Sequence, residues 1–549
     1  MSSNDDCPNV TKKPKLEGIE AQAVKSEETV AQNGNSSLSS SKSPLKTGSK
    51  GPSSVTPSKT KSVEANALFC ETTDEKLGDL RKLWENGDNI NDEKLKIQHK
   101  PFRHGEIHDF VNNRDFVDEF RKLFSKIEFH EKASDLFQFK QSDDLNSVVD
   151  PCVYAINEYL TMKVLPFLKS LTGLPLNQTI DMFLSIYTQT DFLLCHDDEL
   201  DSRRIAFIWY LSEEWSEDFG GTLDLYSATD DMHPDAVVRK LVPECNKFVF
   251  FEVGATSFHQ VSEVLKKECK RQALSGWFYG EPLARPKIEF PVEKSCAVLE
   301  NVQSYKGVLG KFCAEMYLNQ EIYSEINEQL SEESEVLVPG FLRDDVYESI
   351  CKTIVEMDVT NSDFLTCGPA NMSNYKVALE GPPKDGSPSS VDSLSSNIES
   401  LRRLFYSHEF LSFMEKITEF PFTTNAATKV VSSLQKYSHG SFSLLKSGGA
   451  KQTGVTNITE QDVAEEEEEP NLVDVMFFFA NKWSDDRGGL FIYTTMDGEQ
   501  LITVPPEGNC LAVVVRSSTV NSYTNYVNCL SKDDVFFVFK MTFAFDGSI

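Results

Sequence analysis

The sequence lacks several features that define other classes of protein. No run of about 18 apolar residues occurs, so no transmembrane helix is expected. The first thirty residues lack the apolar run flanked by positive charge that a secretory signal has. The 12 cysteines contain no CxxC pair and no regular spacing, which is typical of buried thiols in a reducing compartment. We therefore expect an intracellular protein that neither spans a membrane nor depends on disulfides.

Positive charge is also scarce. The chain has 54 Lys and Arg against 85 Asp and Glu, a formal net charge of −31. Residues 1–65 carry nine Lys and seven acidic residues, so the other 484 residues carry −33. This acidity argues against direct contact with nucleic acid or anionic membranes and favours a basic protein partner.

The length and the apolar content exclude a wholly disordered or fibrous chain. At about 150 residues per domain, 549 residues correspond to three or four domains, and 40% of the residues are hydrophobic. The N-terminal range 1–75 is predicted to be a disordered tail, because its Ser/Lys-rich part has few aromatic residues. Its cluster Lys12, Lys13, Pro14 and Lys15 is either a nuclear import address or a chance patch.

Periodicity divides the remainder into helical and β regions. Residues 78–170 have helical spacing, with Phe116, Phe120, Leu123 and Phe124 on one face. From about residue 180 the pattern changes to short β runs: MFLSIYTQT, RIAFIWYLS, GTLDLYS, KFVFFEV and QALSGWFYG. Short strands without alternating helices indicate an antiparallel sandwich or barrel.

The β region occurs twice. EEWSEDFGGTLDLY at 213–226 resembles NKWSDDRGGLFIYT at 481–494, with Trp215 and Trp483 offset by 268, and LVPECNKFVFFEV corresponds to TVPPEGNCLAVVV downstream. Two matches in the same order indicate a duplicated β domain. We expect domains at 76–290 and 335–549, joined by a linker and helix at 291–334.

Three residues of the first copy could bind a metal. His196 and Asp198 form an HxD motif, and His259 follows 63 residues after His196. Two imidazoles and one carboxylate on one face of a metal suit a non-haem Fe(II) that must also bind a cosubstrate and O2. By spacing alone, these residues could equally be packed side chains. Arg271 begins the next β run and would bind either a carboxylate ligand or an acidic side chain.

Longer motifs give a family resemblance. The segments FHEKASDLFQFKQSDDL, LLCHDDELDSRRIAF, GGTLDLYS, FFEVGATSFHQVSEVL and LSGWFYG resemble the ribosomal prolyl hydroxylases of the 2-oxoglutarate/Fe(II) oxygenase superfamily. The resemblance extends from about residue 80 to the C-terminus. It implies a mainly β fold with flanking α-helices, built from two tandem double-stranded β-helix (jelly-roll) domains.

The resemblance also implies a reaction and a ligand set. His196, Asp198 and His259 would bind Fe(II), and Arg271 would bind the distal carboxylate of 2-oxoglutarate. Tyr187 and Tyr210 stand where the family places cosubstrate-binding hydroxyls, although plain core packing is the alternative. The implied enzyme is a dioxygenase that uses O2, with ascorbate as a supporting reductant.

The implied substrate is a prolyl residue of a basic small-subunit ribosomal protein, hydroxylated at C3, with an effect on translation. Localisation in the cytoplasm and nucleus is expected, and the sequence leaves the oligomeric state open. Two other functions remain: a non-catalytic double-barrel scaffold or regulator in translation, and a metal-dependent cupin isomerase or hydrolase.

The second copy lacks the metal ligands. No histidine follows His439, so we expect a metal-free domain for scaffolding, substrate docking or dimerisation. Lys446, Ser447 and Gly448 stand in place of the HxD motif, and the position of the distal histidine is expected in the segment SYTNYVNC, near Tyr526, again without histidine.

Overall fold

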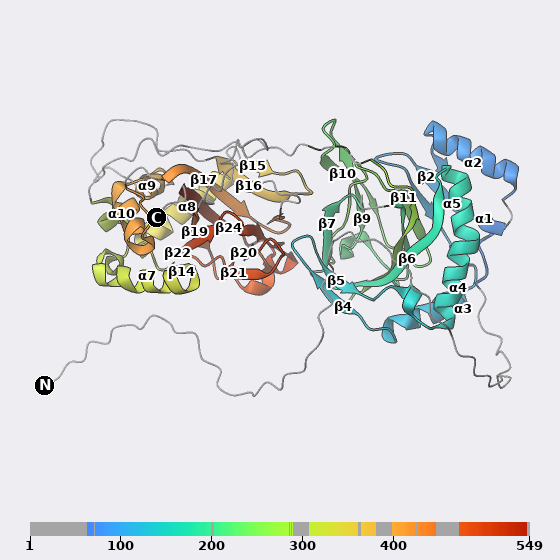
Figure 1. Ribbon diagram of the computed structural model, residues 1–549, viewed down its shortest axis with the longest axis horizontal. Coiled ribbons are helices and arrows are strands. Elements are labelled where there is room, and N and C mark those ends of the chain that lie inside the picture. The colour runs from blue at the N-terminus through green and yellow to red at the C-terminus, as the bar shows by residue number, and fades with distance from the viewer. Residues whose placement is uncertain are drawn as a thin grey trace, which may run out of the picture. The chain divides into compact units, whose positions relative to one another are not determined.

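The computed structural model describes residues 63–545, except for residues 71, 199–201, 285, 287, 289–306, 361–363, 380–397, 424–426 and 446–470. The strands of the described chain form two large antiparallel sheets, of 13 and 11 strands. Figure 1 shows each sheet with its own set of helices. None of the helices in these ranges is long and apolar enough to cross a membrane. The nine cysteines described are all free thiols.

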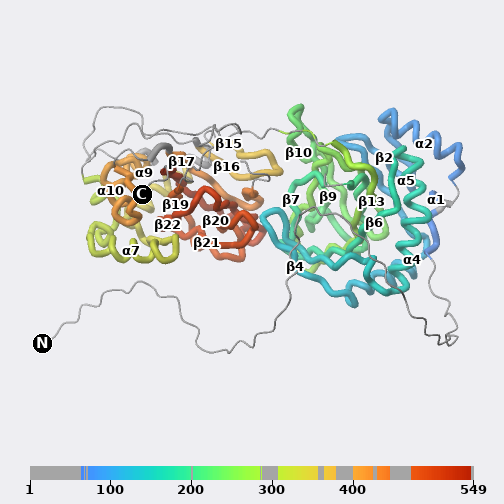
Figure 2. The backbone as a smooth tube through the Cα atoms, in the orientation of Figure 1, coloured from blue at the N-terminus to red at the C-terminus, as the bar shows by residue number. Residues whose placement is uncertain are grey.

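The first sheet folds back on itself so that its two halves face each other (Figure 2). Its spatial order is β1 (Ile90–Asn91), β2 (Leu95–Gln98), β3 (His104–Ile107), β11 (Phe248–Glu252), β8 (Arg203–Tyr210), β13 (Arg271–Gly280), β6 (Leu176–Tyr187), β5 (Phe137–Gln141), β7 (Phe192–His196), β12 (His259–Val261), β9 (Leu223–Ala228) and β10 (Pro234–Leu241), with β4 (His130–Ala133) pairing beside β5. The expected β runs between 182 and 280 all contribute strands, which confirms that part of the prediction.

Helices cover the outer face of the half that contains β6, β8, β11 and β13 (Figure 1). They are α1 (Ala67–Cys70), α2 (Asp74–Asn86), α3 (Arg114–Arg121), α4 (Pro151–Tyr159) and α5 (Leu165–Thr172), and a π-helical turn at Leu160–Val164 joins the last two. Alternation along the strands separates the two faces. Leu184 of β6 packs under the helices, whereas Tyr187 of the same strand faces the interior between the two halves.

Two sequence expectations differ from this arrangement. The region 78–170, expected to be helical, also contains β1 to β5. These strands are two to five residues long, and β3 pairs with β11 more than 140 residues away, so local periodicity carried little signal for them. In the range 1–75, the structure places α1 and the start of α2, so helical structure begins before the expected end of the tail.

The second sheet has the order β14 (Glu335–Pro339), β22 (Cys510–Ser517), β19 (Asn471–Ala480), β24 (Phe536–Phe545), β17 (Ala427–Tyr437), β16 (Ser373–Leu379), β18 (Phe442–Ser443), β23 (Asn521–Thr524), β20 (Phe491–Thr494) and β21 (Gln500–Val504), with β15 (Leu365–Cys367) beside β16. Its helices are α6 (Val308–Phe312), α7 (Gln320–Glu333), α8 (Asp344–Thr360), α9 (Ile398–Phe405) and α10 (His408–Thr418). The run β14-β22-β19-β24-β17 repeats the run β3-β11-β8-β13-β6 of the first sheet.

The repeated WSxD…GG segment has the same conformation in both sheets. The indole N–H of Trp215 donates to the carbonyl of Gly220 over 2.8 Å, and that of Trp483 donates to the carbonyl of Gly488 over 2.7 Å. Gly220 and Gly488 both have positive φ, at 70° and 73°. A Cβ atom at Gly220 would overlap the carbonyl oxygen of Glu263, so the turn requires glycine for two reasons.

We expect Gly220→Ala and Gly488→Ala each to lower the free energy of unfolding by roughly 1–3 kcal/mol, because both force a left-handed backbone and a steric overlap on alanine. Urea denaturation measures the change. Gly78→Ala is the matched control: no atom lies within 4 Å of its Cβ position in α2, so the free energy should rise by about 0.5–1 kcal/mol. A loss of stability in the control equal to that in the turns would contradict the explanation.

His104 of β3 predicts a pH dependence of stability. It is fully buried, and burial lowers its pKa to about 4, although the Phe102 carbonyl opposes the shift. In the unfolded chain this histidine binds a proton below about pH 6.5, whereas in the folded protein it does so only near pH 4. The free energy of unfolding is therefore highest above about pH 6.5 and decreases as the pH falls from about 6.5 towards 4. His104→Phe should flatten the stability profile in that window by up to about 3 kcal/mol in chemical denaturation. An unchanged profile would show that another group governs the acid sensitivity.

Candidate metal and cosubstrate site

Antiparallel pairing of two short strands brings the predicted metal ligands together. His259 of β12 lies directly opposite His196 of β7, and their ring centroids are 4.3 Å apart. Asp198 follows two residues after His196, and its carboxylate oxygens lie 3.4 Å from His196 Nε2 and 3.5 Å from His259 Nε2. Among the described residues, these three form the one group of His, Cys, Asp or Glu with the spacing of a metal site.

Backbone carbonyls orient both imidazoles. Nδ1 of His196 lies 2.8 Å from the carbonyl of Leu194, and Nδ1 of His259 lies 2.8 Å from the carbonyl of Ser257. Because a carbonyl only accepts hydrogen bonds, each Nδ1 carries the proton and each Nε2 is available as a ligand atom. This arrangement is common at metal-binding histidines.

The carboxylate of Asp198 stays ionised. Burial by itself would raise its pKa, but His196 and His259 hold it well below its usual range. Burial would lower the pKa of His196, yet Asp198 raises it. In the protein without metal, the two imidazoles therefore stabilise the buried, ionised carboxylate of Asp198 and offset its desolvation.

A cation without an anionic partner lies in the same interior. Arg271, at the start of β13, is 1% exposed, and its Nε donates to the carbonyl of Gly221 over 2.8 Å. Its Nη2 and the Tyr210 hydroxyl are both buried without a hydrogen-bond partner among the described residues. The guanidinium carbon lies 5.0 Å from the ring centre of Tyr187 and 5.1 Å from that of Tyr210.

The distances in the triad and the unused donors of Arg271 and Tyr210 show whether a metal ion and 2-oxoglutarate would fit this site. Two ligand atoms bound about 2.1 Å from one metal at right angles are ~3 Å apart, close to the separations in the triad. A buried guanidinium and a buried phenol with unused donors are costly unless an anion accepts from them. Burial raises the pKa of Tyr210, although Arg271 opposes the shift, so its hydroxyl remains a donor. The residues therefore fit a divalent metal and a carboxylate-bearing cosubstrate.

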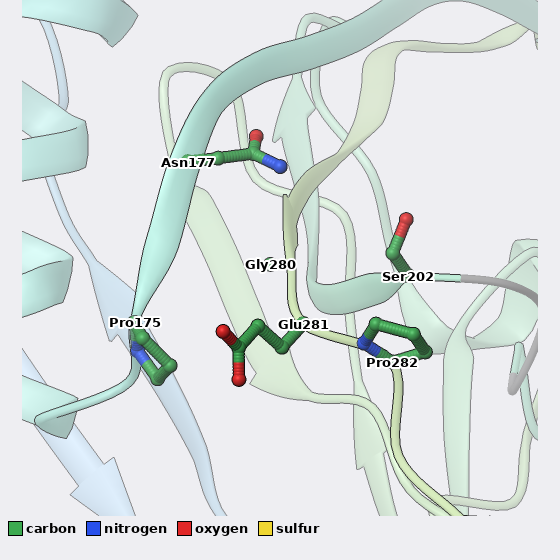
Figure 3. A pocket seen from close by; sticks show the side chains of 6 residues that line it. All are labelled: Pro175, Asn177, Ser202, Gly280, Glu281 and Pro282. Atoms are coloured by element: carbon green, nitrogen blue, oxygen red, sulfur yellow. The ribbon is translucent and has the colours of Figure 1, made fainter.

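A separate cavity does not belong to this site. It has a volume of about 620 Å³ and is lined by Pro175, Asn177, Ser202, Gly280, Glu281 and Pro282 (Figure 3). Gly280 is the last residue of β13, whereas Arg271 is the first. None of the six predicted site residues lines this cavity, so we place the chemistry at the triad rather than in this cavity.

Strand register shows what replaces these groups in the second sheet. Arg271 pairs with Tyr187 in the first sheet, and Phe536 pairs with Tyr437 at the matching place in the second. Phe536 stacks on Tyr437 with ring centres 5.0 Å apart. His259 pairs with Leu225, and Ser522 pairs with Tyr493, the residue that corresponds to Leu225.

The residue at the distal-histidine position is thus Ser522, which lies within the expected segment 522–529, four residues before Tyr526. The strand register identifies the exact residue, which the sequence match could not fix. Lys446, Ser447 and Gly448 lie outside the described residues. Tyr437 and Phe536 show that an aromatic pair fills the place of the cosubstrate pocket.

The structure adds residues that the sequence reasoning missed. Gly221 has a φ of 65°, and a Cβ there would lie 3.1 Å from Cδ of Arg271, so glycine leaves room for the guanidinium stem. Phe139 stacks on Tyr187 with ring centres 4.6 Å apart. The repeated Gly-Gly pair was a usable signal for Gly221, whereas the sequence holds no comparable signal for Phe139.

Comparisons with known proteins agree with the site. Residues 182–279 match the family model of the 2OG-Fe(II) oxygenase superfamily. Residues 305–547 match the model described as oxoglutarate and iron-dependent oxygenase degradation C-term. The first match contains the triad, Arg271 and both tyrosines.

Curated relatives extend the match beyond the site. Prolyl 3-hydroxylase OGFOD1 of Xenopus laevis is 31% identical over 481 residues, covering 82% of this chain and 88% of that protein. Prolyl 3-hydroxylase OGFOD1 of Mus musculus is 36% identical over 335 residues, 60% of each chain. A crystal structure of a Pseudomonas putida prolyl-4-hydroxylase covers 37% of this chain at 16% identity with a TM-score of 0.29.

We expect Tyr210→Phe to have opposite effects on stability and on ligand binding. Without ligand, removing a buried hydroxyl that has no hydrogen-bond partner among the residues described should leave the melting temperature unchanged or raise it. In the Mn(II)-loaded protein without O2, 2-oxoglutarate should bind more weakly by about 1.5–3 kcal/mol, the value of a hydrogen bond to a charged group. Calorimetry measures both. Unchanged 2-oxoglutarate affinity would place the cosubstrate elsewhere.

Proposed function

Because the chain belongs to the prolyl 3-hydroxylase OGFOD1 family of 2OG-Fe(II) oxygenases, we propose that it hydroxylates C3 of a prolyl residue in a protein substrate. The observation that carries the proposal is the combination of the His196, Asp198 and His259 triad with a buried Arg271 whose Nη2 has no hydrogen-bond partner in the described part of the chain. A metal site alone would suit many enzymes. The free Nη2 in the same interior favours a cosubstrate with a second carboxylate.

The residues of the chain have separate roles in this reaction. His196, Asp198 and His259 would hold the metal on one face and leave the opposite face for ligands. Arg271 and Tyr210 would bind the distal carboxylate of 2-oxoglutarate, and the ring of Tyr187 would form a wall beside it. When bound, Fe(II) with 2-oxoglutarate and O2 supplies the oxidising chemistry for an unreactive C–H bond. The buried strand faces around Arg271 exclude water from the pocket.

We propose a basic small-subunit ribosomal protein as the substrate. Residues 66–549 carry a formal net charge of −33, which would attract a basic partner over long range and raise its association rate. Hydroxylation of such a substrate would connect the enzyme to translation. We expect ascorbate to sustain turnover, and we place the protein in the cytoplasm and nucleus. The basic cluster at Lys12–Lys15 lies outside the described residues.

We propose that the second sheet is a metal-free copy of the first, so that the protein has two tandem double-stranded β-helix domains with catalysis confined to the first. The matching strand orders and the replacement of Arg271 by Phe536 support this proposal. The domain limits near residues 76–290 and 335–549, with 291–334 between them, remain those expected from the sequence.

A non-catalytic scaffold is the competing function. A scaffold has no use for a buried hydrogen-bond donor that lacks a partner. Replacing Arg271 by an apolar residue would then stabilise the fold, and Phe536 occupies the matching place in the second sheet. The retained cation at this one place supports an enzyme. A cupin isomerase or hydrolase is disfavoured for the same reason, because neither needs a buried arginine for a second carboxylate.

The proposal predicts a specific product. Purified protein with Fe(II), 2-oxoglutarate and proline-containing ribosomal peptides should form succinate and add one oxygen, about 16 Da, to one peptide, which mass spectrometry detects. His196→Ala should abolish both signals because it removes a metal ligand. His408→Ala is the control, since His408 belongs to α10 near the second sheet. Peptide-dependent succinate that persists in His196→Ala would refute the assignment.

A further inference from the structure

Asp198 has a positive φ. At 61° it lies in the left-handed region, which residues with a Cβ adopt only where the surrounding structure holds them, although Asp tolerates it better than most. This conformation turns the chain immediately after β7 and directs the carboxylate towards the two imidazoles. A carboxylate in this strained position needs neighbours that keep it there.

The indole of Trp277 is one such neighbour. Its Nε1–H donates to Oδ2 of Asp198 over 3.2 Å. Trp277 is half-buried on β13, six residues after Arg271, where it pairs with Asp181 of β6 and Ala206 of β8. A ring fixed between two paired strands offers its N–H in one direction.

Two side chains hold this ring in place. The guanidinium carbon of Arg203 lies 3.7 Å from the ring centre, and the ring of Phe183 lies 5.6 Å from it. A cation over the face and an aromatic ring at its side restrict the rotamers of the indole. The donor that meets Asp198 is therefore fixed before any metal binds.

Ser257 restrains the same loop from the other side. It is 2% exposed, and its hydroxyl lies 2.9 Å from the carbonyls of Asp197 and Gly254. Its own carbonyl accepts from Nδ1 of His259 over 2.8 Å. One residue thus contacts both parts of the triad: the loop that carries Asp198 and the ring of His259.

We propose that Trp277 and Ser257 are positioning residues that hold Asp198 in its left-handed conformation and so preorganise the metal site. The indole engages Oδ2, which leaves the lone pairs of Oδ1 for a metal. The hydroxyl of Ser257 fixes the backbone of the loop one residue earlier. Without these contacts, Asp198 relaxes towards negative φ and its carboxylate moves away from His196 and His259. This inference rests on the proposed metal site, but not on the identity of the substrate.

The test is metal binding without turnover. Mn(II) affinity of the full-length protein is measured by calorimetry without 2-oxoglutarate or peptide, for wild type, Trp277→Phe and Ser257→Ala. Each variant should bind Mn(II) about 10- to 100-fold more weakly, the usual cost of losing a group that orients a metal ligand. With Fe(II) and 2-oxoglutarate under anaerobic conditions, the charge-transfer absorption should need correspondingly more iron to saturate.

Matched controls separate this effect from general damage. Trp84→Phe also shortens a tryptophan, but the indole nitrogen of Trp84 has no hydrogen-bond partner within the described ranges and its ring stacks on Phe250. Ser227→Ala removes a hydroxyl that bonds Asp235 within the β9–β10 hairpin. Both controls should bind Mn(II) as wild type does.

Wild-type Mn(II) affinity in both Trp277→Phe and Ser257→Ala would overturn the inference, as would an equal loss in the controls. If Trp277→Phe does not fold, Trp277→Tyr, which keeps a large ring but lacks the indole N–H, provides the same comparison. A wild-type protein that binds no Mn(II) would refute the proposed function instead. A protein that binds metal normally but hydroxylates no ribosomal peptide would refute the substrate and leave this inference intact.

Discussion

The register between β7 and β12 is the constraint on which the site depends. His196 and His259 are 63 residues apart in the sequence, and they meet because these strands pair with the two histidines directly opposite. A shift by one residue would turn one imidazole to the other face of the sheet. The neighbouring pairs of β12 with β9 and of β5 with β7 fix this register from both sides.

A second constraint is the buried guanidinium. Nε of Arg271 donates to one backbone carbonyl and the guanidinium lies beside two tyrosine rings, while Nη2 has no hydrogen-bond partner in the part of the chain that is described. A buried cation without an anion lowers the stability of the free protein, and a bound anion removes this penalty. The pocket therefore has a higher affinity for an anionic ligand and the free protein a lower stability. The large apolar core under the helices, which includes Trp209, Phe248 and Phe250, lets the fold tolerate that cost.

Much of this site could be predicted from the sequence, because motif spacing and family resemblance identify groups that carry chemistry. They predicted His196, Asp198 and His259 as metal ligands, and Arg271, Tyr187 and Tyr210 as cosubstrate-binding residues. They could not predict Ser257 or Trp277, since a serine carbonyl and an indole N–H act through positions that only the folded strands define. In the second sheet, the sequence placed the distal position in the segment 522–529, and strand pairing identified Ser522 within it. The strands β1 to β5 were missed because their partners lie far along the chain.

The tight turn at Gly220 and Gly221 recurs at Gly488 and Gly489, where Phe536 stands in place of the arginine. The second sheet therefore has the same turn although no arginine lies beside it. Its glycines are retained because the backbone of each barrel passes too close to a neighbouring segment to accept a side chain. Within this chain, the tryptophan and glycine pattern is therefore common to both sheets, whereas the first residue of the strand, Arg271 in β13 and Phe536 in β24, differs between them.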